Sequence, residues 1–154
     1  MALRLIVVGA TKENFYKQSE QEYIKRLKRF AKLSYTEVAS SKKSADRSAC
    51  LQMEEVNILK QVGEQDFVIL LDEKGKQFTS REFASKLNNL LVNNANLTFV
   101  IGGAFGFSDA VRQRANFFIS LSNLTFPHHL VRTIFLEQLY RGFTILSGGN
   151  YHND

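Results

Sequence analysis

The sequence predicts an α/β fold in which one domain, residues 1–154, is built on a mostly parallel sheet flanked by helices on both faces. Short apolar runs of strand length alternate along the chain with longer segments of helical spacing, an order typical of parallel strands joined by crossover helices. One run, Asp66–Asp72 (DFVILLD), is apolar without a break between its end residues, as expected of a central strand buried on both faces. The sequence contains no linker, internal repeat or low-complexity segment, which favours a single domain.

The elements can be placed in order from their periodicity and end signals. Thr79 and Glu82 form a capping-box pattern, Ser108 is a candidate N-cap, and Pro127 suits the first position of a helix. We expect strands at Arg4–Gly9, Leu33–Ala39, Asp66–Asp72, Asn96–Ile101 and Asn116–Leu121. We expect helices at Thr11–Leu33, Ala45–Val62, Thr79–Val92, Ser108–Ala115 and Pro127–Leu146, with a polar loop at Ser40–Ser44, a turn at Glu73–Lys76 and a polar tail at Ser147–Asp154.

Composition excludes several classes of protein. A hydrophobic content of 44% with a single proline argues against disordered and collagen-like chains. No apolar run approaches the roughly 20 residues that a membrane-spanning helix needs, and the first residues lack a signal-peptide cleavage pattern. The lone Cys50 cannot form an internal disulfide, which fits a reducing compartment. We therefore expect a soluble cytoplasmic protein with no membrane partner.

The net charge of +5 is spread unevenly. Residues 1–47 carry 11 Lys/Arg and 5 Asp/Glu, whereas residues 48–154 carry 9 and 10. Within the first part, Lys25, Arg26, Lys28 and Arg29 fall close together on an expected helix. Such a run is often only the solvated face of a helix, but an excess on one side of a nearly neutral remainder favours a polyanion partner, and nucleic acid in particular.

Common nucleotide, hydrolase and metal motifs are absent from the sequence. It has no G-x-G-x-x-G, no P-loop and no G-x-S-x-G elbow. Its histidines are His128, His129 and His152, and the first two would point about 100° apart on a helix, which makes a poor metal pair. We therefore expect no metal site.

What remains is a set of three loops that follow strands: Leu71–Lys76, Gly102–Phe107 and Ser122–Pro127. In a parallel sheet such loops emerge on one side, where ligands of open α/β folds bind. The glycine-rich loop that follows Thr98–Ile101 would let a ligand lie against bare backbone, although glycines also suit a plain tight turn.

Apolar side chains on these loops fit a neutral, adenosine-like group held by backbone hydrogen bonds. They are Leu71, Phe105, Leu124 and Phe126, and each of them also suits an ordinary core position.

Several separated segments resemble the RlmH (YbeA-like) family of SPOUT methyltransferases. The matching segments are LDEKGK at 71–76, SREFA at 80–84, FVIGGAFGF at 99–107, SLSNLTFPHHLVR at 120–132, LEQLYRG at 136–142 and YH at 151–152. The resemblance covers essentially the whole chain, in order and without large gaps.

The resemblance implies S-adenosylmethionine-dependent methylation at N3 of a pseudouridine in a stem-loop of 23S ribosomal RNA within assembled ribosomes. It also implies a carboxy-terminal trefoil knot and a homodimer whose active site includes parts of both subunits. By family position the cofactor would contact Leu71, Gly103 and the loop residues Ser122, Asn123, Leu124, Thr125, Phe126 and Pro127. Asn150 and Asn153 depart from the family tail, which commonly has a proline and a basic residue there; the missing basic residue puts an RNA-phosphate contact at the tail in doubt.

Methyl transfer to an imide nitrogen requires that the imide proton leave, so a base or a cation should stand nearby. Our candidates are His152 as base or orienting group, Arg141 as the cation, and Tyr140 and Tyr151 as stacking or orienting groups. Each has a structural alternative; Arg141, for example, lies one helical turn after Glu137 and suits an ion pair. Two other functions stay open: a non-catalytic ribosome-associated RNA-binding protein, and a methyltransferase or other nucleotide-binding enzyme acting on a small molecule.

Overall fold

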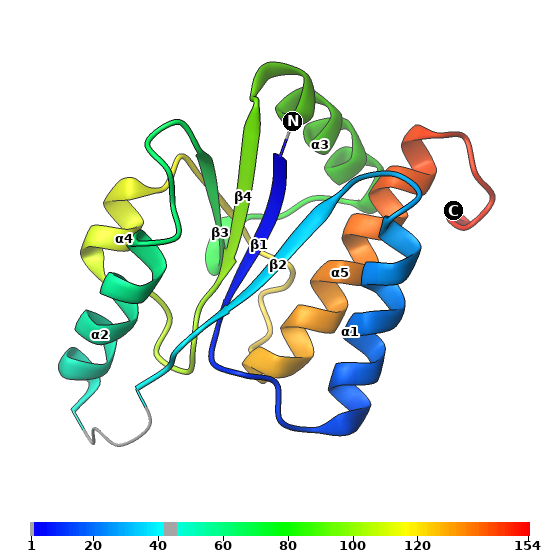
Figure 1. Ribbon diagram of the computed structural model, residues 1–154. Coiled ribbons are helices and arrows are strands. Elements are labelled where there is room, and N and C mark those ends of the chain that lie inside the picture. The colour runs from blue at the N-terminus through cyan, green and yellow to red at the C-terminus, as the bar shows by residue number, and fades with distance from the viewer. Residues whose placement is uncertain (1, 42–45) are drawn as a thin grey trace.

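The central sheet of the computed structural model, which describes residues 2–41 and 46–154, has five parallel strands (Figure 1). They are β1 (Ala2–Val8), β2 (Leu33–Val38), β3 (Phe67–Lys76), β4 (Asn96–Ile101) and β5 (Phe117–Ile119). Their order across the sheet is β2-β1-β4-β3-β5, and every neighbouring pair is parallel. The predicted α/β class with a parallel sheet is therefore confirmed.

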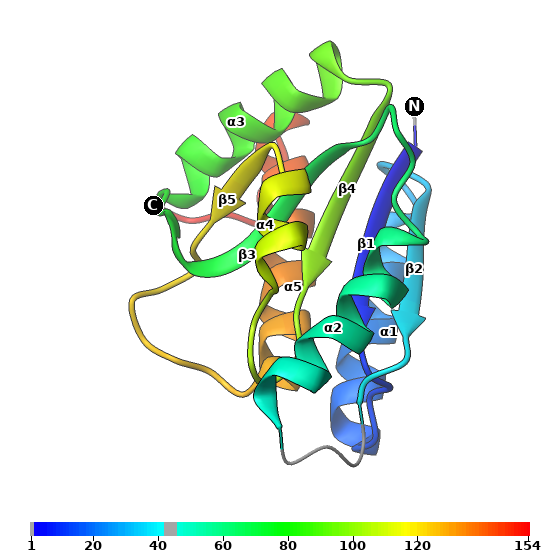
Figure 2. The same cartoon turned by 90° about the vertical axis from the view of Figure 1, so that its left-hand side faces the viewer.

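Helices cover both faces of this sheet. They are α1 (Asn14–Leu27), α2 (Arg47–Leu59), α3 (Ser80–Asn93), α4 (Asp109–Arg114) and α5 (His128–Leu146). On one face α5 packs between α1 and α3, and on the other α2 packs beside α4 (Figures 1 and 2). All the expected helices are present, although α1 and α2 are shorter than predicted, and Ala45 and part of the expected loop Ser40–Ser44 fall outside the described residues.

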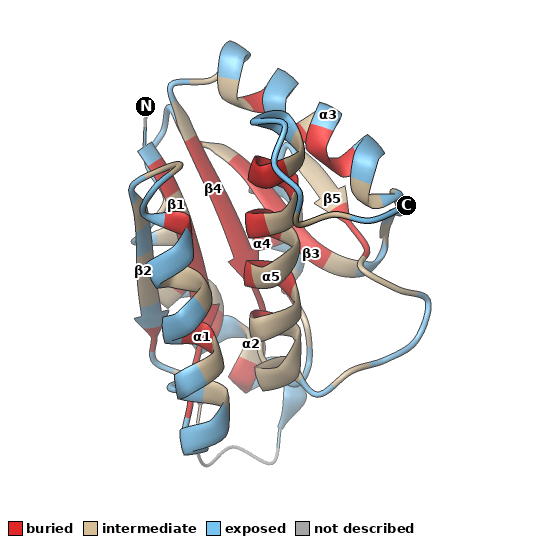
Figure 3. Ribbon diagram, turned by 90° about the vertical axis from the view of Figure 1, so that its right-hand side faces the viewer, coloured by how far each residue is buried: buried red, intermediate tan, exposed pale blue. Residues whose placement is uncertain are grey.

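Strand side chains alternate between two cores. In β1, Leu5 and Val7 pack with Phe135 and neighbouring residues of α5, whereas Ile6 and Val8 pack with residues of α2 and α4. Because successive side chains of a strand point to opposite faces, a strand covered on both sides must be apolar at every position. The buried central strands in Figure 3 show why the uninterrupted apolar runs were reliable strand signals.

The predicted end signals are largely confirmed. The Thr79 hydroxyl accepts a hydrogen bond from the Glu82 amide at 3.2 Å, and the Glu82 carboxylate accepts one from the Thr79 amide at 2.7 Å, which completes the capping box of α3. The Ser108 hydroxyl caps α4 by accepting from the Val111 amide. Pro127 lies one position earlier than predicted, at the N-cap of α5.

The predicted turn Glu73–Lys76 is wrong. Strand β3 continues to Lys76, where the Lys76 carbonyl accepts a hydrogen bond from the Ser120 amide at 3.0 Å, after a register shift that begins beyond Leu71. A Cβ on Gly75 would lie only 2.6 Å from backbone atoms of Ile119, so glycine is needed for this close approach. The charged residues that were predicted to form a turn are instead an irregular stretch within the strand.

Candidate functional site

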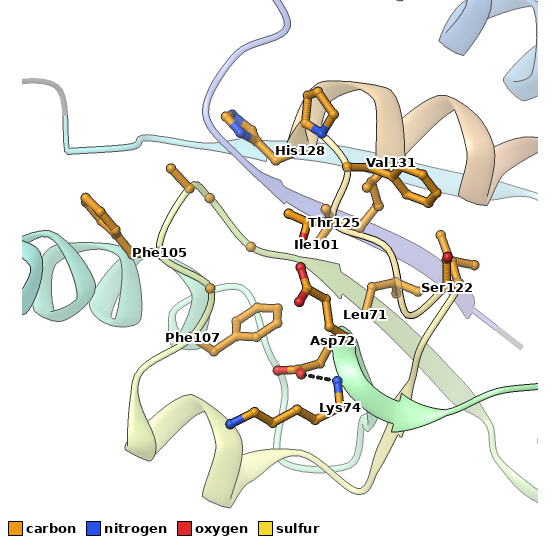
Figure 4. A pocket seen from close by; sticks show the side chains of 18 of the residues that line it. Leu71, Asp72, Lys74, Ile101, Phe105, Phe107, Ser122, Thr125, His128 and Val131 are labelled. Carbon is orange, nitrogen blue, oxygen red and sulfur yellow. Dashed lines mark hydrogen bonds between the residues drawn. The ribbon is translucent and has the colours of Figure 1, made fainter.

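A cavity of about 590 Å³ lies at the carboxyl ends of β3 and β4 (Figure 4). Its walls come from Leu71–Lys74, from Ile101–Phe107, and from the segment that leads out of β5 into the first turn of α5. The three strand-end segments that the sequence predicted on one side of the sheet therefore share one hollow. Its volume is in the range of small-molecule sites, and both apolar side chains and glycine backbone line it.

Most of the residues predicted to contact a cofactor line this cavity. They are Leu71, Gly103, Ser122, Leu124, Thr125, Phe126 and Pro127. Asn123 is not among the lining residues; its side-chain oxygen accepts a hydrogen bond of 2.8 Å from the Gln77 amide group. This bond ties the loop after β5 to the segment that follows β3.

The charged groups of the cavity wall are partly paired. The Asp72 carboxylate forms an ion pair with Arg112 and accepts a hydrogen bond from the Lys74 amide at 2.8 Å. Burial, together with smaller contributions from the neighbouring His129 and Arg132, lowers the pKa of His128 to about 4. His128, which lines the cavity, is therefore a neutral imidazole near pH 7.

Gly103 lies directly against Glu54 of α2. A Cβ on Gly103 would meet the two carboxylate oxygens of Glu54 at 2.9 and 3.1 Å and a methyl group of Val8 at 3.3 Å. We expected glycine to leave room for a ligand in the cavity; these contacts lie instead with α2 and β1, which pack behind the loop. Sequence reasoning missed Glu54, although it interrupts a buried face of α2 formed with Cys50 and Ile58 at helical spacing.

Glu54 is an unusual carboxyl. The residue is only 6% exposed, and its Oε1 atom has no hydrogen-bond partner among the described residues. Burial raises the pKa of this carboxyl, because the charged form loses its hydration.

A second group of polar side chains gathers where the tail folds back on α5. The Arg141 guanidinium donates to the Glu137 carboxylate from two nitrogens, at 3.1 and 2.7 Å, so the ion pair weighed from the sequence is present. The Tyr151 hydroxyl donates to the same Glu137 oxygen at 2.9 Å, and His152 Nδ1 lies 3.1 Å from an Arg141 nitrogen. We call Glu137, Arg141, Tyr151 and His152 the tail cluster. Glu137 was named in the sequence only as an ion-pair partner.

Tyr140 lies in a different environment from the tail cluster. It is 9% exposed and its ring packs against Tyr23, Phe30 and Tyr151. The structure therefore places Tyr140 in the core under the cluster.

Burial raises the pKa of Tyr151, and its hydrogen bonds raise it further, so this phenol is neutral near pH 7.

The predicted basic residues Lys25, Arg26, Lys28 and Arg29 are exposed at the carboxyl end of α1. Arg26 pairs with Glu22 at 2.8 Å, and its guanidinium carbon lies 5.7 Å from the centre of the Tyr140 ring. The basic helix end and the tail cluster are therefore neighbours.

The cavity and the tail cluster lie at opposite ends of α5. His128 and Val131 of its first turns line the cavity, whereas Arg141 lies 13 residues beyond His128. At 1.5 Å per residue this separation is about 20 Å along the helix axis. Figure 1 shows the tail at the carboxyl end of α5, whereas the cavity-lining residues lie at its amino end. Within one chain the predicted catalytic and cofactor residues do not come together.

The described part of the chain contains neither a metal-binding group of side chains nor a membrane-spanning helix. Among residues 2–41 and 46–154, no three His, Cys, Asp or Glu side chains are grouped so that they would hold a metal ion. No helix in these ranges is both long and apolar enough to cross a membrane.

Comparison with known proteins gives close relatives along the full length. A family described as "Predicted SPOUT methyltransferase" matches residues 1–152. Proteins called ribosomal RNA large subunit methyltransferase H are 40% identical in Streptococcus suis, over 99% of both chains, and 44% identical in Clostridium botulinum, also over 99% of both. The namesake from Caldicellulosiruptor saccharolyticus is 41% identical over 97% of this chain and 99% of its own.

Two solved structures share the fold at low sequence identity. A probable methylase family protein from Haemophilus influenzae superposes with a TM-score of 0.55 at 14% identity, over 99% of this chain and 70% of the other. A tRNA (m1G37) methyltransferase from Aquifex aeolicus gives 0.54 at 15% identity, over 92% of this chain and 70% of the other.

Proposed function

The chain belongs to the RlmH family of SPOUT methyltransferases, and from that premise we propose that it methylates large-subunit ribosomal RNA with S-adenosylmethionine as methyl donor. The acceptor we propose is N3 of a pseudouridine in a stem-loop of 23S ribosomal RNA, reached in the assembled ribosome in the cytoplasm. The names of the full-length relatives support ribosomal RNA as the class of substrate. The cavity at the ends of β3 and β4 is the single structural observation that carries the proposal.

The cavity residues fit the methyl donor. Bound S-adenosylmethionine supplies an activated methyl group on a positively charged sulfur. Leu71 and Phe126 provide apolar wall, and the backbone at Gly103 offers hydrogen-bonding groups. Asp72 and Glu73 bring carboxylates to the wall beside the cations of Arg47, Lys74 and Arg112, and the neutral His128 adds no further positive charge.

The tail cluster has a cation that can stabilise the acceptor after its imide proton has left. Arg141 is always charged, and its bonds to Glu137 fix the plane of its guanidinium. A fixed cation beside the imide stabilises the anion that forms when the N3 proton leaves to solvent water. Tyr151, kept neutral by its raised pKa, can donate a hydrogen bond but cannot act as the base near pH 7. Correct positioning of donor and acceptor can supply about 7–11 kcal/mol of the barrier reduction.

We propose a homodimer because one chain cannot bring its own tail cluster to its own cavity. In a two-fold symmetric dimer, α5 of one protomer would pack across α5 of its partner. This packing would place the tail of one protomer at the cavity of the other. The exposed side of α5 supports this arrangement. Leu130 and Ile134 are only partly covered in the isolated chain, and Figure 3 shows a half-buried stripe along the helix.

The trefoil knot implied by the family also stays a proposal. The segment after β5 lies against both of the other strand-end segments at the cavity, and the Gln77–Asn123 hydrogen bond holds it there. A chain threaded in this way should refold slowly, in a phase that a prolyl isomerase acting at Pro127 does not accelerate.

The experiment that tests the proposed function is mass spectrometry of ribosomal RNA from cells that lack this protein. We expect one methyl group to be missing from one pseudouridine of 23S RNA, and purified protein with S-adenosylmethionine to restore it on isolated ribosomes. Unchanged RNA would refute the proposal. Ribosome binding without cofactor affinity would point to the RNA-binding alternative, and activity on free nucleoside to the small-molecule enzyme.

A further inference from the structure

Four ring side chains form a continuous row from the cavity mouth to the start of α1. We call Phe15, Tyr16, His129 and His128 the mouth row. Its ring centres are 4.4 Å apart from Phe15 to Tyr16, 6.2 Å from Tyr16 to His129, and 4.3 Å from His129 to His128. The last member lines the cavity, so the row is continuous with the proposed donor site.

Packing in the hydrophobic core does not account for the position of the mouth row. Phe15 is 62% exposed, although burying a phenylalanine side chain is worth about 1.5–3 kcal/mol. Neither Phe15 nor Tyr16 belongs to the two core clusters of the described chain, whereas Tyr23 of the same helix and Phe30 just after it pack against the larger one. A row of rings beside a cavity, with Phe15 exposed and the other three half-buried, indicates a surface that receives another flat group.

On these grounds, and resting on the proposed function, we propose that the mouth row is a stacking surface for an unpaired RNA nucleotide next to the target base. Single-stranded RNA is recognised largely by stacking of its bases on Phe, Tyr and His rings. Burial lowers the pKa of both histidines, so the row presents neutral rings near pH 7.

The charges around the row suit a polyanion. Lys12 and Lys17 are exposed on either side of Phe15 and Tyr16 in the sequence; the acidic residues near the row are Glu13, which lies between them, and Glu37, and both act on His129. The wider region, residues 1–47, carries the whole positive excess of the chain. Lysines flanking exposed rings are the usual arrangement of a single-strand binding surface, in which cations contact phosphates and rings contact bases.

The test compares Phe15→Ala with Phe15→Trp, using assembled ribosomes as substrate. We expect Phe15→Ala to raise KM for ribosomes by about tenfold, the loss of one base-ring stack, and Phe15→Trp to keep it near the wild-type value. Cofactor affinity by calorimetry and dimer mass by light scattering should stay unchanged in both. The matched control is Val92→Ala, which removes an apolar side chain that is 76% exposed on α3.

Two results would overturn the inference. An unchanged KM in Phe15→Ala would show that no base stacks there, and dissociation of the dimer would show that a second copy of the chain covers the row. Ultraviolet crosslinking of wild-type protein to ribosomes separates this inference from the proposed function, because it does not need methylation. We expect a nucleotide attached to Phe15 or Tyr16; methylation without such a crosslink and without a KM change would refute the stacking surface alone.

Discussion

Arg141 Nη1 lies 3.1 Å from Nδ1 of His152. Because an arginine only donates hydrogen bonds, this contact makes Nδ1 the acceptor and leaves the ring proton on Nε2, which lies 3.0 Å from the Asp154 carboxylate. Both nitrogens of His152 are therefore engaged in this chain. The arrangement favours His152 as the group that orients Arg141 over His152 as a free base.

Replacing His152 by Ala should slow methylation while cofactor affinity stays nearly intact. Arg141 would keep its bonds to Glu137 but lose the contact that fixes its other nitrogen, so we expect a fall in kcat of at least about tenfold. Single-turnover assays on ribosomes measure the rate of methylation, and calorimetry measures cofactor affinity. If the rate and the affinity fell by the same factor, His152 would have no role in the methyl-transfer reaction.

Replacing Gly103 by Val should weaken cofactor binding by displacing the loop. The new side chain would press on Glu54 and Val8, and overpacking of this kind costs about 1–3 kcal/mol. Adding Glu54→Ala should recover most of the lost affinity, because it removes the carboxylate that the side chain meets. If the double variant binds no better than Gly103→Val, the obstruction is in the cavity itself.

Glu54 should also make folding stability depend on pH. A carboxyl whose pKa is raised in the folded state stabilises the fold fully below its ordinary value of 4.5, and this contribution is lost as pH rises through the raised value. The free energy of unfolding should therefore fall with rising pH across that window, and Glu54→Gln should flatten the fall. Urea unfolding at a series of pH values measures both slopes; the same slope in both proteins would contradict the assignment.

Reversing the charges of Lys25, Arg26, Lys28 and Arg29 should weaken ribosome binding and reduce its salt dependence. Each lost contact to a phosphate lowers the slope of log affinity against log salt by about 0.7–0.9. The control is Lys60→Glu, which reverses an exposed charge at the end of α2, on the opposite face of the sheet. Equal effects of control and variant per reversed charge would mean that only net charge matters.

The sequence was a good guide wherever one local rule decided the structure. Apolar runs located the strands, and Thr79 and Ser108 marked helix starts, because strand periodicity and capping act within a few residues. The meeting of the three cavity-lining segments at one edge of the sheet could be predicted from the parallel pairing of the strands alone. Lys76 was misread as a turn residue because its pairing with Ile119 depends on a partner 43 positions away.

Long-range contacts account for what was missed at the site. Arg132 is fully buried and donates to Thr11 and to the Val8 carbonyl, contacts that join α5 to the segment before α1 where helix was predicted. Glu54 looks like any acidic residue of a surface helix until α2 is laid against the loop at Gly103. Such pairs become visible only when the fold brings distant segments together.

Subunit complementation tests most directly the claim that one protomer's tail cluster serves its partner's cavity. Arg141→Ala and Gly103→Val proteins are mixed, unfolded and refolded together so that protomers exchange, and are assayed at a limiting cofactor concentration at which neither homodimer is active. Half of the dimers would then be mixed, and each mixed dimer would contain one intact site, so we predict that methylation of ribosomes returns to about a quarter of the wild-type level. Activity no higher than the sum of the separate homodimers, with mixed dimers shown by mass spectrometry, would contradict the account.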